Sequence, residues 1–137
     1  MDARYSLKDA NDLLPLIRSI ADEIVERRAE RRRLFRTKEE LEVAQTPEGF
    51  SSSIADLESR LFEHKVAIDS AVHEFEMLGL TVLRMHPLTV HVPGQTQRGP
   101  ITFCWQYGEP SIGHGHEVGE EEDPRRPLRV RATHSES

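Results

Sequence analysis

A chain of 137 residues is long enough for one domain, and with 36% hydrophobic and 31% charged residues its core must be small or elongated. The net charge of −6 makes nucleic acid an unfavoured partner, and the single cysteine excludes an internal disulfide framework. No apolar run approaches the roughly 20 residues that span a bilayer and no secretory signal is visible, so we expect a cytoplasmic protein without membrane contact.

The first predicted element is helical. Ser6 is placed to cap a helix, and Asp9 follows three residues later, a weak form of the capping box. Apolar residues then recur at spacings of three and four, which indicates one buried helix face. Pro15 falls inside this pattern and either kinks a single helix or begins a second one. We prefer a short helix over residues 7–12, followed by a long helix that ends near residue 44.

A second long helix follows a linker at residues 45–53. Its apolar side steps by three or four residues throughout, as in a heptad pattern, and Gly79 suits the left-handed position that closes a helix. Two long helices with a short linker predict an antiparallel helical hairpin over residues 7–79. The positions on this side are Ile54, Leu57, Leu61, His64, Ile68, Ala71, Phe75 and Leu78.

From Leu80 the pattern alternates and β-branched residues become frequent. Four candidate strands cover residues 80–85, 88–93, 100–106 and 111–116, with turn signals between them. They predict a small antiparallel β meander over residues 80–117, and residues 118–137 lack periodicity and are expected to form a largely irregular tail. The predicted fold is therefore α+β: a long antiparallel helical hairpin followed by a β meander, in a single domain of residues 1–128.

Three stretches resemble a known family. They are "SLKDANDLLP" near the start, the helical hairpin, and "FCWQYGEPSIGHGHE" with a later arginine and "PL". Together they are similar to a conserved bacterial family known as domain of unknown function 2203, over nearly the whole chain to about Leu128. The resemblance implies a helical hairpin and a small β unit in a bacterial cytoplasmic protein, and it implies no activity. The chain departs from the family pattern at Gly115, where an aromatic residue is usual, and in "GEEEDP", which leaves Arg125 as the match for the family arginine.

The "GHGHE" stretch is the main candidate for a binding site. In a strand, His114 and His116 share one face and lie about 7 Å apart along it, so both can reach one divalent transition metal such as zinc. A three-residue loop before this strand would place Cys104 opposite His114, whereas a four-residue loop would place Phe103 and Trp105 on the histidine face instead. The sequence does not choose between these registers. The candidate metal ligands are Cys104, His114, His116 and Glu117, and Glu117 reaches the site only if the strand bulges or turns.

A purely structural interpretation of the same stretch is favoured. The histidines would hydrogen-bond Glu109, Glu117 or the acidic tail, and Glu109 would shape the turn or accept backbone N–H bonds. Arg125 either pairs locally with the preceding "EEED" run or forms an anion-binding site with His116.

The first long helix carries a basic cluster at residues 27–38, with seven basic residues and one acid. It either binds phosphate groups or pairs with the acids of the second helix, and the acidic composition favours pairing. His64 interrupts the apolar side of the second helix, and Arg27 and Arg31 occupy the matching positions on the first helix. Antiparallel packing places Arg31 near Glu63 and His64. We expect a polar layer between the helices that fixes register or oligomeric state.

These features favour a non-enzymatic, homodimeric interaction protein, with a metal or anion site on the C-terminal β hairpin and an unidentified protein as a further partner. The alternative is a small metal-dependent enzyme that uses the candidate metal ligands. No nucleophile motif, glycine-rich phosphate loop or His-Glu-x-x-His pattern accompanies them, so the sequence indicates no reaction.

Overall fold

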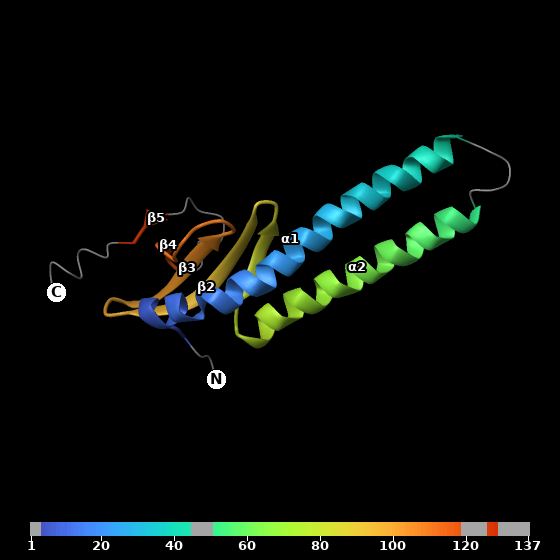
Figure 1. Ribbon diagram of the computed structural model, residues 1–137. Helices are drawn as coiled ribbons and strands as arrows, with labels where there is room; N and C mark the ends of the chain where they lie inside the picture. Colours follow the sequence, from blue (N-terminus) through green and yellow to red (C-terminus); the bar gives the residue numbers. More distant parts are fainter. Residues whose placement is uncertain (1–3, 45–50, 119–125, 129–137) are drawn as a thin grey trace. The chain divides into compact units, whose positions relative to one another are not determined.

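The computed structural model describes residues 4–44, 51–118 and 126–128. Two helices, α1 (Leu7–Ala44) and α2 (Ser51–Met77), precede an antiparallel sheet, which confirms the predicted α+β fold (Figure 1). The strands are β1 (Thr81–Met85), β2 (Leu88–Thr96), β3 (Gly99–Gln106), β4 (His114–His116) and β5 (Arg126–Pro127). The chain divides into two compact units, one of residues 20–74 and the other of residues 1–19 and 75–137.

The unit of residues 20–74 is the antiparallel helical hairpin. Lys38 near the end of α1 pairs with Glu58 near the start of α2, and Arg27 further back on α1 meets His64 further along α2. The helices bury aliphatic side chains against each other, because each places an apolar residue on the same side every three or four positions. One buried cluster consists of Leu34, Leu57 and Leu61, with Leu41 packed against it.

The preferred break between two helices near Pro15 was wrong, because α1 is one helix with Pro15 inside it. Ser6 caps this helix as predicted: the Asp9 N–H donates to the Ser6 hydroxyl at 3.0 Å. Pro15 removes one backbone hydrogen bond, but its ring lies on the exposed side, and Leu14 and Ile17 stay buried on either side of it. Burial of one continuous apolar stripe therefore outweighs a proline cost of about 3 kcal/mol.

The end of α2 follows the predicted glycine. Gly79 has a φ of 83°, which a residue without Cβ adopts readily. The Leu80 N–H donates to the Phe75 carbonyl, and the Gly79 N–H donates to the Glu76 carbonyl, both at 2.9 Å. This pair of bonds satisfies two of the last helical carbonyls and turns the chain into the sheet.

Over the described residues, the sheet has five strands in chain order, β1-β2-β3-β4-β5, and all neighbouring pairs are antiparallel. The first three strands lie close to their predicted ranges, whereas β4 is only the last part of the predicted residues 111–116. β5 is an additional strand within the segment expected to be irregular, and the remainder of that segment after Val118 lies outside the described residues apart from Leu128. Neither helix, over the residues described, combines the length and apolar character that a membrane span requires.

The two faces of the sheet differ in chemistry. One face is apolar: Val90 pairs with Trp105 and Val92 pairs with Phe103, and all four side chains are fully buried. Residues between these positions point to the opposite face, because side chains alternate along a strand. The polar candidates for function therefore lie on that opposite face.

Candidate functional site

One row of paired residues crosses three strands of the sheet. Cys104 on β3 pairs with His91 on β2 and with His114 on β4, and His116 pairs with Thr102 two residues along β3. Residues directly opposite each other in a ladder share a face, and so do residues two apart in one strand. His91, Cys104, His114 and His116 therefore lie on one face of the sheet.

The register at β4 is the one that places Cys104 opposite His114. The strands themselves are separated by seven residues, 107–113, so the ladder ends before the expected Tyr107–Ser111 pair. Three of the four predicted ligands thus share a face. Glu117 follows the last residue of β4 and takes part in the site through its carbonyl oxygen, which accepts a bond from His116.

His116 contacts an imidazole that the sequence reasoning missed. Its Nε2 lies 3.3 Å from Nε2 of His91, and the two rings meet edge to face with centroids 4.8 Å apart. His116 is only 4% exposed, and His91 is half-buried. Because side chains alternate along a strand, His91 in "LTVHVP" lies on the other face of β2 from Val90 and Val92. Only the long-range strand register brings it to His116.

The second bond of His116 fixes its tautomer. Nδ1 lies 3.2 Å from the Glu117 carbonyl oxygen, which can only accept a hydrogen bond. Nδ1 of His116 therefore carries the proton, and in the neutral ring Nε2 presents its lone pair. The contact between the two Nε2 atoms is then a hydrogen bond from His91 to His116.

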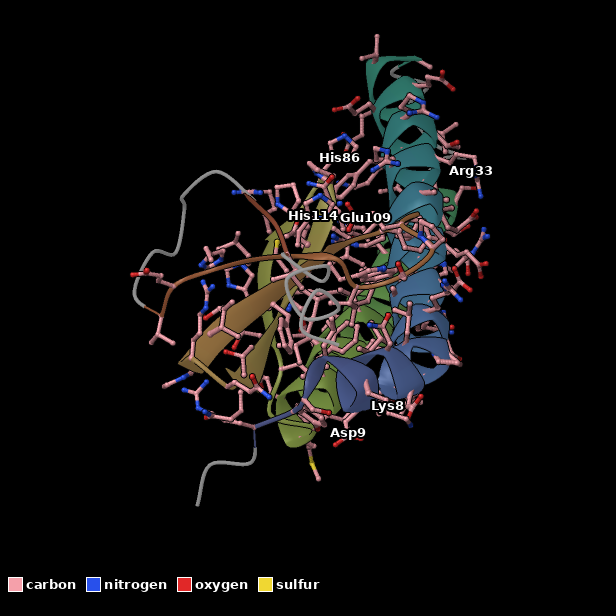
Figure 2. All side chains as sticks on the ribbon, turned by 90° about the vertical axis from the view of Figure 1, so that its left-hand side faces the viewer. Lys8, Asp9, Arg33, His86, Glu109 and His114 are labelled. Carbon is pink, nitrogen blue, oxygen red and sulfur yellow. The ribbon has the colours of Figure 1, made fainter. Side chains whose placement is uncertain are left out.

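His114 turns toward a different partner. His114 and Glu109 lie close to each other (Figure 2). Nδ1 of His114 is 3.7 Å from Oε2 of Glu109, too far for a hydrogen bond, and the His114 side chain is 35% exposed. Oε1 of Glu109 accepts a hydrogen bond from the Gln106 N–H at 2.8 Å. The backbone carbonyl of Glu109 accepts a hydrogen bond from the Trp105 Nε1–H at 3.0 Å. Glu109 therefore shapes the turn after β3, the role that the structural interpretation gave it.

The predicted ligands do not converge on a single point in the part of the chain that the structure describes. No three histidine, cysteine, aspartate or glutamate side chains are placed there to hold one metal ion. Cys104 is 1% exposed in the middle of the row. The anion-site candidate Arg125 lies outside the described residues.

The two arginines expected in the polar layer between the helices have different partners on α2. Nη1 of Arg27 lies 3.1 Å from Nδ1 of His64, whereas Nε of Arg31 donates to the Leu61 carbonyl at 3.3 Å. Arg31 also places its guanidinium 5.3 Å from the centre of the Phe35 ring, a cation–π distance. His64 therefore contacts Arg27, and Arg31 bonds to the α2 backbone one turn away.

Acidic residues on both helices form ion pairs with part of the basic cluster. Glu30 pairs with Arg33 and with Arg60, at 3.8 Å for the latter, and the hydrogen bond from Arg33 lowers the pKa of Glu30. Lys38 lies 3.3 Å from Glu42 and 3.4 Å from Glu58, and the hydrogen bond to Glu42 is the main cause that raises the pKa of Lys38. Within the described residues, no ion pair involves the exposed residues Arg32 and Arg36.

Comparison with known proteins identifies one family. The model of the DUF2203 family, described as an uncharacterized conserved protein, matches residues 4–128. No curated protein and no solved structure matches the chain.

Proposed function

This protein belongs to the DUF2203 family, and we propose that it is a non-enzymatic interaction protein that works as a homodimer joined through the outer face of α2. The family description assigns no activity, so the proposal rests on the surfaces of this chain. One observation carries it: Phe62 and Val66 lie one helical turn apart in the middle of α2, with exposed fractions of 64% and 47%.

These two residues belong to a longer outer stripe on α2. The stripe has no charged residue, every member is exposed, and the steps along it are four, three, four, four and three residues. A helix that is apolar on only one side needs one partner, whereas a second uncharged stripe of heptad spacing is typical of a helix that packs on a further helix. The outer stripe consists of Ala55, Ser59, Phe62, Val66, Ser70 and His73.

Charge favours α1 of a second copy as the partner of this stripe. Within α2 there are six acids (Asp56, Glu58, Glu63, Asp69, Glu74 and Glu76) and two bases (Arg60 and Lys65), so two α2 helices packed together would repel each other. The 27–38 segment of α1 has the opposite balance, and its exposed Arg32 and Arg36 are available to the acids that flank the stripe. A two-fold axis would make this contact twice, with each α2 against the partner's α1, and would close the assembly at two chains.

Light scattering on a size-exclusion column tests the proposal with the full-length protein. The wild type is expected to elute with twice the chain mass of 15.7 kDa, and Phe62→Glu is expected to elute as a monomer with unchanged helical circular dichroism. Val118→Glu is the matched control, because Val118 is 54% exposed but follows the sheet. The control should remain dimeric.

A charge exchange tests which helix is the partner. Arg32→Glu combined with Arg36→Glu should weaken the dimer, and adding Glu63→Lys with Asp69→Lys should restore it. A wild-type monomer at every concentration, or a Phe62→Glu variant that stays dimeric, would overturn the proposal. Failure of the charge exchange with a monomeric Phe62→Glu would exclude α1 as the partner helix.

A further inference from the structure

We propose that His91 and His116 form a zinc-binding site through their two Nε2 atoms. The proposal concerns the sheet and is independent of the homodimer. It also differs from the ligand set that the sequence suggested, since it replaces His114 by a histidine from β2.

The distance between the two nitrogens fits one shared metal ion. Zinc binds imidazole nitrogen at about 2.0–2.1 Å, and two ligands of a tetrahedral ion at these lengths lie about 3.3–3.4 Å apart. The observed Nε2–Nε2 distance is 3.3 Å. A zinc ion could therefore take the place of the His91 Nε2–H···Nε2 His116 hydrogen bond without separating the two nitrogens.

The tautomer of His116 is the one that a metal requires. Histidines that bind metals commonly donate their other ring N–H to a backbone carbonyl, which fixes the ring and directs the remaining lone pair at the ion. His116 makes this bond to Glu117, at 3.2 Å. On metal binding, the Nε2 proton of a neutral His91 ring would move to its Nδ1 through solvent, so that Nε2 could coordinate, and a proton would be lost to solvent only from a ring that carried two.

The backbone around the pair is held on several sides. β4 pairs with β3 and with β5, and β2 pairs with β1 and with β3, so neither histidine lies on an edge strand. His116 is buried and His91 is half-buried, so His91 is the ring of the pair that is partly in contact with solvent. Two imidazoles fill half of a tetrahedral shell, and we assign the remaining positions to water.

Titration calorimetry with zinc chloride and the full-length, untagged protein tests the site. We expect one zinc ion per chain, and we expect His91→Ala and His116→Ala each to weaken binding by at least about tenfold. His114→Ala and His73→Ala are the matched controls and should bind zinc like the wild type. His114 shares the sheet face, and His73 is on α2, so the controls separate this site from the earlier ligand set and from other histidines.

Thermal unfolding with and without zinc covers the case in which the buried His116 cannot be replaced. Zinc should raise the Tm of the wild type and of Phe62→Glu, and it should not raise the Tm of His91→Ala, whose half-buried side chain makes it the safer variant. A wild type without heat of binding or Tm shift would overturn the proposal. Equal zinc affinity in His91→Ala would overturn it as well, and would leave the two rings as a hydrogen-bonded pair.

Discussion

The side-chain amide of Asn11 on α1 makes two hydrogen bonds to the backbone of Ile112, which precedes β4. The amide bonds both the N–H and the carbonyl of Ile112, as a neighbouring strand would. The Ile112 N–H donates to Oδ1 of Asn11 at 2.8 Å, and Nδ2 of Asn11 donates to the Ile112 carbonyl at 3.2 Å. Ile112 is 2% exposed, so its backbone groups have little access to water. This contact fixes the chain two residues before His114.

Asn11→Ala should therefore lower the free energy of unfolding by about 1–3 kcal/mol, because both backbone groups of Ile112 would be left without these partners. Urea unfolding followed by circular dichroism measures the change. Asn11→Asp is the companion variant: its carboxylate still accepts from the Ile112 N–H but sets a second acceptor against the Ile112 carbonyl, so it should also be destabilised at neutral pH. Equal stability of Asn11→Ala and the wild type would show that water replaces both bonds.

Gly115 and Gly113 offer a matched pair for the packing of β4. A Cβ on Gly115 would lie 2.7 Å from the Thr102 carbonyl oxygen and 3.1 Å from the Leu128 side chain, whereas a Cβ on Gly113 would meet nothing within 4 Å. Gly115→Ala should cost about 1–3 kcal/mol, since the neighbour at 2.7 Å is backbone that cannot rotate away. Gly113→Ala should leave the Tm unchanged. A similar Tm for the two variants would contradict the observed close approach.

His64→Leu tests the polar layer between the helices. His64 is half-buried at a position of the heptad pattern between Leu61 and Ile68. Arg27, its hydrogen-bond partner, also forms a 2.9 Å ion pair with Glu23, and this ion pair does not depend on His64. The leucine should raise the free energy of unfolding by about 1 kcal/mol through additional apolar burial. His64→Ala, which removes the same hydrogen bond without filling the space, should lower it. If both variants are destabilised alike, the Arg27–His64 bond is worth more than the packing.

The ion pair of Glu30 should give a pH-dependent contribution to stability. Its pKa in the folded protein lies below the ordinary value of 4.5 because Arg33 donates a hydrogen bond to the carboxylate. A lowered folded pKa stabilises the protein above the unfolded pKa, and this contribution disappears as the pH falls through the folded pKa. Glu30→Gln should therefore lower the Tm at neutral pH and have no effect once the carboxyl is protonated. Arg33→Gln should show the same trend, and a Tm difference that grows toward low pH would contradict it.

Local patterns in the sequence determined the elements. Apolar residues three and four apart specified both helices, alternation specified the first three strands, and Gly79 marked the end of α2, because each signal depends on the backbone geometry of a few neighbouring residues. The same locality explains the failures. Pro15 was given too much weight because the burial of Leu14 and Ile17 on either side of it depends on tertiary packing, which local sequence does not show. β5 has only two residues, too few to show a periodic pattern.

The candidate site was decided by tertiary structure. The sequence showed that His114 and His116 share a face, but it could not specify which residues of other strands lie opposite them, because the pairing depends on turn lengths and long-range register. That register brings His91 from β2 to 3.3 Å from His116, and it places His114 beside Glu109. The sequence therefore determined the chemical groups that are available on the sheet, and only the folded chain decided which of them meet.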